Sequence, residues 1–475
     1  MQAVSIPAEL KDKNMDTNQW ELSKQSLESI LSESRYTPGE FVKALGSPSF
    51  MALLKHINPL ALVGLKAALK LKVYSHLPRL DRRFAKECGR GRFAKRCWEI
   101  RSVTFTYRSQ AVDGRDILLS GRVTFLANQE QGTPHQAKTI SLHMHQAFFH
   151  EEWAPSKTLM FMPLKVLWDS VVIEPDLQKW GINYGIESDG GGSALHMARQ
   201  LADCIVAALE IMQQHGVSLA PEGYTTNWGS SQGALPTLMF ANWYDTEAPQ
   251  WFKDAIRLRA TFSAEGAAHM PELMNFLYRH PEDIDVNFIL LLAYFKAFTP
   301  SQLGGYKPEE FVPQWYQDTR FRVNGRALTF LEAVSHHYPQ LTDPYFQKMK
   351  SFDQVYAPDM LTADGKIDTD CPKLRAWLAC LKRYNNLDDW TPAHSVYLAH
   401  SPADDMIPFA LAYNLYRTIS NEGRNPLVHM LAVPSMRFIP DGGLKPHFII
   451  AFVGQLIMAL YENPEDMRRP YKSVQ

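Results

Sequence analysis

The sequence has almost no net charge and no long uninterrupted apolar segment. Among its 475 residues, 49 Lys and Arg nearly balance 50 Asp and Glu, which leaves a net charge of −1. No overall field therefore favours a nucleic acid as partner. The longest apolar stretch near the N-terminus, residues 59–73, contains Lys66, Lys70 and Lys72. It is too short and too charged to span a bilayer.

Cysteine is also scarce. The sequence has five cysteines: Cys88, Cys97, Cys204, Cys371 and Cys380. No two of them form a CxxC pair, and their spacing does not match a zinc site. An odd number at scattered positions favours reduced, buried thiols, although Cys88 with Cys97, or Cys371 with Cys380, could bridge in an exported protein. Residues 1–20 lack the apolar stretch of a signal peptide. We therefore expect a cytoplasmic protein, or an exported one if a signal has been removed.

A Gly-x-Ser-x-Gly motif lies near the middle of the chain. Residues 225–234 read TTNWGSSQGA, with a β-like run before the motif and a Leu-, Met- and Phe-rich helical segment after it. A serine is an effective nucleophile when it is exposed on a sharp strand-to-helix turn, and Gly229 and Gly233 remove side chains that would collide there. The motif predicts Ser231 as the nucleophile, with Ser230 pointing elsewhere.

Two later segments supply an acid and a base. Asp404 lies in HSPADDMIP, directly after the apolar stretch 395–399, and His447 opens the last helical segment, residues 448–461. A carboxylate orients the histidine in such catalytic triads. The order Ser231, Asp404, His447 differs from the orders of chymotrypsin and subtilisin. It predicts a Ser-Asp-His triad.

Each of these assignments has an alternative. Ser231 could be an ordinary helix N-cap, a role that serine performs well. His447 could only cap the helix that it begins. Glu265, at the end of the strand after the motif, could serve as the acid in place of Asp404. Asp405 is interpreted as a solvated carboxylate at a helix start.

The triad chemistry also requires donors for an oxyanion. The backbone N–H of Gln232, at the start of the helix after the turn, is the first predicted donor, aided by the helix dipole. A second N–H is expected from the loop after the strand 139–143, from Gln146 or Ala147.

Three histidines in this loop region suggest a metal site at first sight. They are His143, His145 and His150, and no suitably spaced carboxylate accompanies them. Zinc sites need a set of three or four ligands. We therefore predict structural histidines, and neither a metal nor a cofactor.

These motifs together resemble the α/β-hydrolase superfamily and, within it, the secretory lipase family, whose members carry a large helical cap. The resemblance runs from about residue 100 to the C-terminus. Residues 102–125 are similar to the family's opening hairpin, 145–156 to its His-Gly loop and Ala-Pro-Ser, and 172–181 to its next strand and turn. Residues 400–408 resemble its His-x-x-x-Asp-x-x-Val-Pro, which places the acid at Asp404.

Some residues depart from the family pattern. Ser230 stands where the family usually has a bulky residue, Ala234 where a second glycine often follows, and Gln146 where the oxyanion loop has glycine. The last difference leaves the second oxyanion donor open. Residues 1–99 lie outside the resemblance.

Alternation of strands and helices predicts an α/β fold with a mostly parallel sheet and helices on both faces. The expected strands are 102–107, 117–126, 139–143, 170–174, 224–228, 258–262, 395–400 and 427–434, with a helix over 197–215. Four parts are predicted: an N-terminal helical extension (1–99), the first part of an α/β-hydrolase core (100–266), a helical cap insertion (267–390) and the second part of the core (391–475).

Apolar spacing in the N-terminal part predicts helices over 18–34, 38–45 and 48–71. Residues 66–101 are strongly basic, with interleaved Leu, Phe and Trp. Such a segment could bind an anionic lipid surface or another polyanion. A solvated face that packs its aromatic side chains on the core is the favoured interpretation, so membrane contact is not favoured.

The predicted function is hydrolysis of a carboxylic ester through an acyl-enzyme on Ser231, without a cofactor. The Leu, Phe and Tyr content of the cap favours a small-molecule ester with an apolar moiety. A capped serine exopeptidase is an alternative, with Glu309 and Glu310 binding a free amine. An inactive binding protein on a hydrolase fold is the other, suggested by Ser230 and Gln146. The oligomeric state is not predicted.

Overall fold

The structure is a computed structural model. It describes residues 21–45, 59–87, 97–129, 133–146, 153–178, 181–183, 193–266, 268–279, 298–311, 322–323, 326–327, 356–404, 407–432, 446–468 and 472–474. Across these ranges, no helix combines the length and the apolar character that crossing a bilayer would require.

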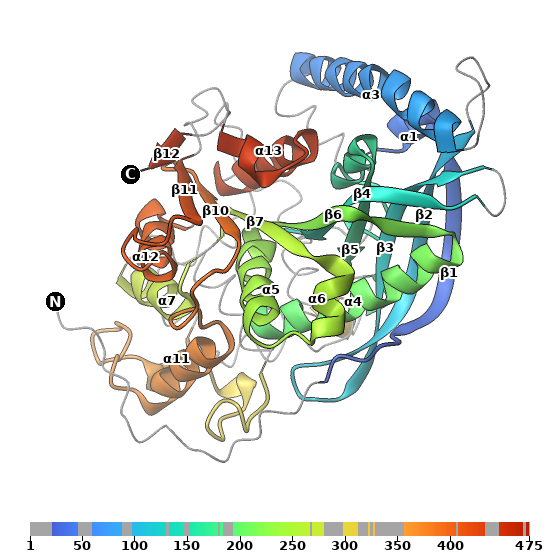
Figure 1. The fold of residues 1–475 in the computed structure, drawn as a ribbon. Coiled ribbons are helices and arrows are strands. Elements are labelled where there is room, and N and C mark those ends of the chain that lie inside the picture. Colours follow the sequence, from blue (N-terminus) through green and yellow to red (C-terminus); the bar gives the residue numbers. More distant parts are fainter. Residues whose placement is uncertain are drawn as a thin grey trace.

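A ten-stranded sheet forms the centre of the molecule, in the order β1-β2-β3-β5-β4-β6-β7-β10-β11-β12 (Figure 1). The strands from β5 to β11 in this order pair in parallel, and the outer ones pair antiparallel. The bounds are β1 (Leu27–Tyr36), β2 (Trp98–Gln110), β3 (Asp116–Asn128), β4 (His135–Met144), β5 (Ser170–Pro175), β6 (Val217–Ser230), β7 (Leu258–Ala264), β10 (Ser395–His400), β11 (Val428–Ala432) and β12 (Lys472–Val474). The predicted mostly parallel α/β sheet is confirmed.

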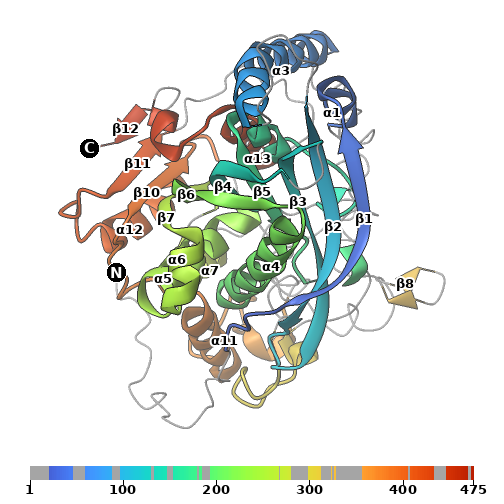
Figure 2. The same cartoon turned by 45° about the vertical axis from the view of Figure 1, so that its right-hand side comes forward.

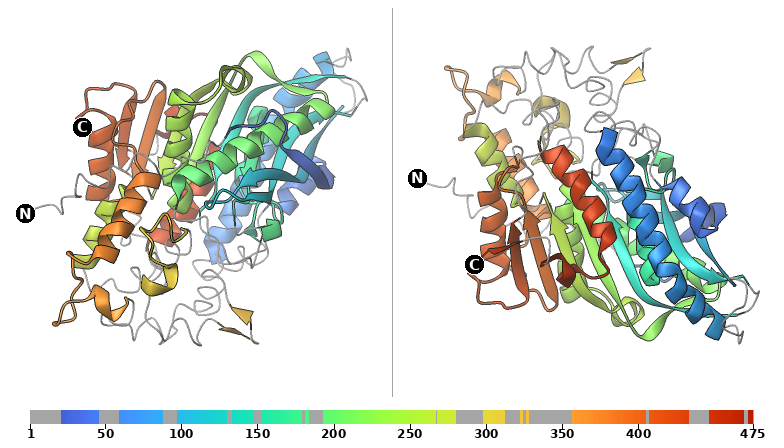
Figure 3. Two further views of the ribbon diagram at one scale, coloured as in Figure 1. Left: turned by 90° about the horizontal axis from the view of Figure 1, so that it is seen from below. Right: turned by 90° about the horizontal axis from the view of Figure 1, so that it is seen from above.

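Helices cover both faces of this sheet. In Figure 1, α4 (Ala194–Gln214), α5 (Ala234–Thr246), α6 (Gln250–Ile256) and α12 (Phe409–Ile419) lie below it. Above it lie α3 (Pro59–Glu87) and α13 (Pro446–Leu460). The two opposite views of Figure 3 separate the same two layers, with α4 and α5 in front in one and α3 and α13 in front in the other. Short 3-10 helices complete these layers: η3 (Met162–Trp168), η4 (Gly181–Asn183), η6 (Ser231–Gly233) and η12 (Pro464–Arg468).

The central strands are buried on both faces, which explains their sequences. All six residues of β5 are buried, and so are the last six of β6. A strand covered by helices on both sides has no solvent face, so its sequence is a continuous apolar or small-residue run. In a parallel sheet the carboxyl ends of neighbouring strands meet at one edge, where ligands bind in α/β folds. The loops that leave β4, β6, β7 and β10 therefore share this edge.

The N-terminal part differs from the prediction. Residues 27–34, expected in a helix over 18–34, instead belong to β1, which extends the sheet beside β2, as Figure 2 shows. That helix prediction is wrong because β1 is an edge strand whose side chains are mostly exposed. Its backbone hydrogen bonds to β2 stabilise it, so it needs no alternating apolar pattern. The helix expected over 38–45 is present as α1 (Pro38–Ala44).

The described segment between β7 and β10 combines helices with short strands and loops, and the helical cap insertion remains a prediction. This segment contains α7 (Met270–Arg279), η8 (Pro308–Phe311), the two-residue strands β8 (Arg322–Val323) and β9 (Arg326–Ala327), η11 (Pro358–Met360) and α11 (Pro372–Tyr384). The ring of Tyr278 on α7 lies 5.7 Å from that of Tyr356 and 6.3 Å from that of Trp377 on α11. These contacts pack α7 against α11. The predicted boundaries at 267 and 390 remain predictions, and most of the apolar stretch 288–298 lies outside the described residues.

Candidate active site

The turn between β6 and α5 holds Ser231 in a strained conformation. Its φ is +50°, in the left-handed region that residues with a Cβ rarely occupy. Backbone strain of this kind persists only where the surroundings enforce it, and it is concentrated at functional sites. The conformation matches the sharp strand-to-helix turn that the sequence predicts for Ser231.

Three glycines allow this turn to pack. A Cβ on Gly229 would overlap Thr237 Oγ1, and one on Gly233 would overlap the carbonyl oxygen of Met144 at the end of β4. A Cβ on Gly266, just after β7, would overlap the backbone of Ser231 itself. The first two are the predicted glycines, and they are needed because neighbouring backbone approaches too closely for any side chain.

Ser231, His447 and Asp404 form a continuous hydrogen-bonded line. Ser231 Oγ lies 2.9 Å from His447 Nε2, and His447 Nδ1 lies 2.8 Å from Asp404 Oδ2. A neutral imidazole protonated at Nδ1 satisfies both bonds, because Nδ1–H then donates to the carboxylate and Nε2 accepts from the hydroxyl. The structure thus brings together three predicted residues from η6, the start of α13 and the loop after β10.

The Asp404 carboxylate is buried but well satisfied. Its Oδ1 accepts a hydrogen bond of 2.9 Å from the backbone N–H of Ile407. Burial raises the pKa of this carboxyl, but the charge and hydrogen bond of His447, with smaller effects of His400 and Ile407, outweigh burial and leave the pKa lowered. Asp404 is therefore ionised at neutral pH. Asp405 lies outside the described residues.

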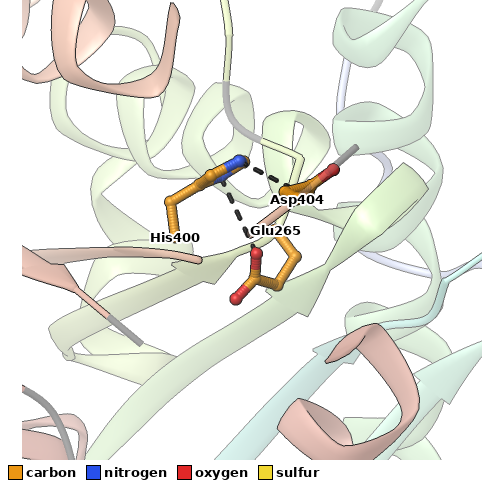
Figure 4. Close-up of side chains that lie close together, drawn as sticks. All are labelled: Glu265, His400 and Asp404. Carbon is orange, nitrogen blue, oxygen red and sulfur yellow. Dashed lines mark ion pairs between the residues drawn. The ribbon is translucent and has the colours of Figure 1, made fainter. Parts of the chain in front are cut away.

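Glu265 and His400 lie behind Asp404, and Figure 4 draws the three side chains. Glu265 Oε2 accepts from the backbone N–H of Ser401 at 3.0 Å and lies 3.9 Å from His400 Nδ1. Because His447 Nδ1 is paired with Asp404, the geometry does not support Glu265 as the acid that orients the imidazole.

The same three side chains could in principle hold a cation, since their ligand atoms lie within 4.8 Å of one another. Each already serves another bond, however. Asp404 accepts from His447 and Ile407, Glu265 accepts from Ser401, and His400 Nε2 donates to the carbonyl of Ile407 at 2.6 Å. A cation here would compete with these hydrogen bonds for the same atoms. The donor set therefore fits a hydrogen-bonded cluster better than a metal site.

The loop after β4 passes directly beside the nucleophile turn, as the contact between Gly233 and Met144 shows. The Gln146 side chain is buried, and its Oε1 accepts a hydrogen bond of 3.3 Å from Ser230 Oγ. Ser230 thus points at this loop, and Ser231 rather than Ser230 is hydrogen-bonded to His447. Gln232 follows Ser231 in η6, where the first oxyanion donor was predicted. Ala147 lies outside the described residues, so the second donor stays a prediction.

The histidines of the loop make structural hydrogen bonds. His143 Nδ1 lies 2.9 Å from Glu174 Oε1, and its Nε2 lies 3.1 Å from Gln455 Nε2 on α13. Both ring nitrogens of His145 face backbone carbonyls, at 2.7 and 2.9 Å. These bonds tie the end of β4 to β5 and α13. His150 lies outside the described residues.

Sequence reasoning missed two residues close to the site, Gly266 and His400, and a third, Lys165 in η3, which contacts the strand that precedes the nucleophile. Gly266 was not singled out, although a glycine directly after a strand-end carboxylate is a usable signal. His400 stands first in the acid motif, and no role was assigned to it. Lys165 is fully buried, with its Nζ 3.5 Å from the centre of the Trp228 ring on β6. Nothing in its local sequence predicts that burial.

No protein-family model matches the sequence, and no curated protein is significantly similar to it. Solved structures do resemble the fold. A Legionella pneumophila protein described as a candidate hydrolase superposes with a TM-score of 0.56 at 14% identity, over 94% of this chain and 100% of the other. The rice cell wall degrading esterase LipA of Xanthomonas oryzae superposes with a TM-score of 0.54 at 13% identity, over 80% and 94%. The chain therefore has the α/β-hydrolase fold that the sequence motifs indicated.

Proposed function

We propose that the protein is a serine hydrolase that cleaves carboxylic esters through an acyl-enzyme on Ser231. One observation carries the proposal, namely the unbroken line of hydrogen bonds from Ser231 through His447 to Asp404 at 2.9 and 2.8 Å. The strained φ of Ser231 adds support, because few structural roles require it. The likeness in fold to an esterase agrees with an ester as the substrate class.

In the first half-reaction Ser231 Oγ attacks the acyl carbonyl while His447 Nε2 accepts the hydroxyl proton. The tetrahedral oxyanion accepts a hydrogen bond from the backbone N–H of Gln232, and loss of such a donor costs about 3 kcal/mol of barrier. Collapse of this intermediate breaks the ester C–O bond, and His447 gives its proton to the departing alcohol. The acyl group then remains on Ser231.

The second half-reaction repeats these steps with water. His447 accepts a proton from water as the water attacks the acyl carbon, and then returns it to Ser231 Oγ as the carboxylic acid leaves. Asp404 keeps the proton of the neutral imidazole on Nδ1 and stabilises the imidazolium that forms twice per turnover. Atoms and protons balance without a cofactor. The substrate that we propose is a small-molecule ester with an apolar moiety.

Covalent labelling with a fluorophosphonate probe tests this proposal. We expect labelling of the wild type and of Ser230→Ala, and none of Ser231→Ala. Ser218→Ala is a matched control, because Ser218 lies exposed on the same strand, β6. Labelling that persists in Ser231→Ala but disappears in Ser230→Ala would show that the nucleophile is Ser230, one residue before the one we assign. A wild type that is not labelled would favour the inactive binding protein.

Substrate class is resolved by comparing nitrophenyl esters from acetate to palmitate with aminoacyl anilides. Faster cleavage of the anilides would favour the exopeptidase. The carboxylates suggested for that alternative give it little support, because Glu310 accepts a hydrogen bond of 2.8 Å from the backbone N–H of Lys307 and so caps its own turn. The Glu309 side chain is outside the described residues. We expect ester hydrolysis to dominate.

A further inference from the structure

The loop that carries Asp404 is tied down on two sides. The backbone N–H of Ser401, at its start, donates to Glu265 Oε2 at 3.0 Å. The carbonyl of Ile407, at its end, accepts from His400 Nε2 at 2.6 Å. Between these ties the Asp404 carboxylate accepts from the Ile407 N–H and from His447. The position of Asp404 therefore depends on one side chain from the end of β7 and one from the end of β10.

These two side chains face each other in the interior. Glu265 and His400 are each 1% exposed, and Glu265 Oε2 lies 3.9 Å from His400 Nδ1 (Figure 4). His400 Nδ1 is buried and has no hydrogen-bond partner among the residues that the structure describes. Glu265 has a φ of +54°, so its backbone is strained in the conformation that directs the carboxyl at the loop. The arrangement leaves one unpaired ring nitrogen beside one carboxyl group.

Charge decides how many protons this arrangement holds. His400 Nε2 carries a proton, because it donates to a carbonyl. His400 Nε2 also lies 3.4 Å from Asp404 Oδ2, so Glu265 and Asp404 stand on either side of one ring. If Glu265 were ionised beside a neutral His400, two buried carboxylates would repel each other. If both Glu265 and His400 Nδ1 were protonated, the buried positive charge of the ring would face a neutral carboxylic acid. One proton between them leaves the pair neutral.

The environment places that proton on the carboxyl group. Burial raises the pKa of Glu265 well above its usual range, and the nearby charge of Asp404 raises it further. Burial lowers the pKa of His400, against the opposing effect of Asp404. Both directions favour a carboxylic acid at Glu265 and a neutral ring at His400. Among the residues that the structure describes, the titratable groups that act on these two are Asp404, in the loop after β10, and His447, on α13.

We propose that Glu265 and His400 hold a single proton between them and act as a neutral pair that positions the Asp404 carboxylate for His447. The inference rests on the proposed function. Both are positioning residues and not catalytic ones, because they act on Asp404, whereas the hydrogen bond that the structure describes for Ser231 Oγ is to His447. The pair explains why a second acidic residue is buried beside the triad: it anchors the loop while leaving Asp404 as the single negative charge.

Three variants test the pair by kinetics. In Glu265→Gln, an amide keeps the acceptor for Ser401 and offers a donor to His400, so we expect kcat/KM to stay at the wild-type level. In Glu265→Ala the loop loses its anchor. We expect kcat/KM to fall by about 10- to 100-fold, by analogy with the loss that follows removal of a residue that orients a metal ligand. Glu222→Gln, at an exposed position on β6, is the matched control.

The pH profile separates a neutral pair from a merely structural contact. If the pair is neutral, Glu265→Gln replaces one neutral group with another, so the acidic limb of kcat/KM keeps its wild-type midpoint. If Glu265 is ionised in the wild type, the same change removes a negative charge near His447 and moves that midpoint to lower pH. A shifted midpoint, or a Glu265→Gln variant as impaired as Glu265→Ala, would overturn the proposal.

A measurement without turnover distinguishes failure of the pair from failure of the proposed function. In protein labelled with 15N-histidine, the resonances of His400 are identified by their absence in His400→Phe. We expect Nε2 to stay protonated and the ring not to titrate between about pH 5 and 8, where an unperturbed histidine changes charge. An ordinary titration of His400 would refute the pair even in an active enzyme. If the wild type is inactive but the His400 ring does not titrate, the proposed esterase function is refuted and the proposed pair is not.

Discussion

Each oxygen of the Asp404 carboxylate has its own donor. Oδ2 accepts from His447, and Oδ1 accepts from the backbone of Ile407. An asparagine at this position would keep the shape of the side chain. Its amide N–H could then face His447 Nδ1, and the imidazole would be held in the wrong tautomer. The negative charge beside His447, and the placement of the ring proton on Nδ1, therefore both depend on Asp404.

We expect Asp404→Asn to lower kcat by about 10,000-fold with little change in KM, the effect of a wrong histidine tautomer in serine hydrolases. Steady-state kinetics on a nitrophenyl ester measures it, with Asp389→Asn, at an exposed position, as control. A loss of only a few-fold would mean that another group orients His447.

Glu265 makes a second prediction at this scale, on stability. Because its pKa is raised in the folded protein, the native state holds a proton that the unfolded chain releases above its ordinary pKa. The stabilisation is fully present below that ordinary pKa and is lost as the pH rises through the folded-state pKa. Glu265→Gln has no such proton to lose.

Between the ordinary pKa and the folded-state pKa of Glu265, the free energy of unfolding of the wild type should therefore fall by about 1.4 kcal/mol per pH unit relative to that of Glu265→Gln. Urea unfolding at a series of pH values measures the difference. In the control Glu222→Gln the difference should not change with pH. A flat difference for Glu265→Gln would mean that Glu265 is ionised in the native protein.

At the scale of the element, close backbone approach determines where the nucleophile turn sits. The turn is enclosed by the end of β4, through Gly233, and by the end of β7, through Gly266. Neither contact involves a large side chain, so neither is visible as an apolar pattern. The strands themselves must stay in register for η6 to keep its place.

We expect Gly266→Ala to displace Ser231 and to destabilise the protein by about 1–3 kcal/mol, as overpacking in a dense interior does. Esterase activity should fall with it. Gly454→Ala is the matched control, because a Cβ at Gly454 in α13 meets no atom of the described part of the chain within 4 Å. There alanine should stabilise by about 0.5–1 kcal/mol, the usual helix preference over glycine. Thermal unfolding measures both, and equal effects at the two sites would contradict the packing argument.

At the scale of the whole molecule, the thiols report on the compactness of the core. Cys97, Cys204, Cys371 and Cys380 are free and buried. The pairing suggested for Cys371 and Cys380 is therefore absent. Burial also raises the pKa of the Cys204 and Cys380 thiols, which lowers their fraction of reactive thiolate. Cys88 lies outside the described residues.

We therefore expect these four thiols to react with Ellman's reagent only when the protein unfolds, so that at most one thiol reacts quickly in the native state. Thiol titration in buffer and in denaturant measures this. Addition of a reductant should leave the melting temperature unchanged. A melting temperature that falls with reductant would reveal a disulfide and contradict the assignment.

The sequence alone determined the features that depend on local chemistry. A strand covered on both faces is built from apolar or small residues with few charges, so the core strands were predicted, whereas the exposed edge strand β1 was mistaken for a helix. A hydroxyl, an imidazole and a carboxylate are recognisable residue types, and the strained turn needs glycines at fixed spacing. Ser231, Asp404 and His447 could therefore be selected before any geometry was known.

Only the tertiary structure decided what surrounds these residues. Glu265 and His400 are separated by 134 positions, which include the predicted cap, and they meet because β7 and β10 pair in parallel, with Ala264 beside Ala399. Whether a buried carboxyl is charged depends on distances of a few ångströms to its neighbours, and such distances are set by packing across the sheet. Local sequence carries no record of that packing, so the proton that we assign to Glu265 follows from the fold.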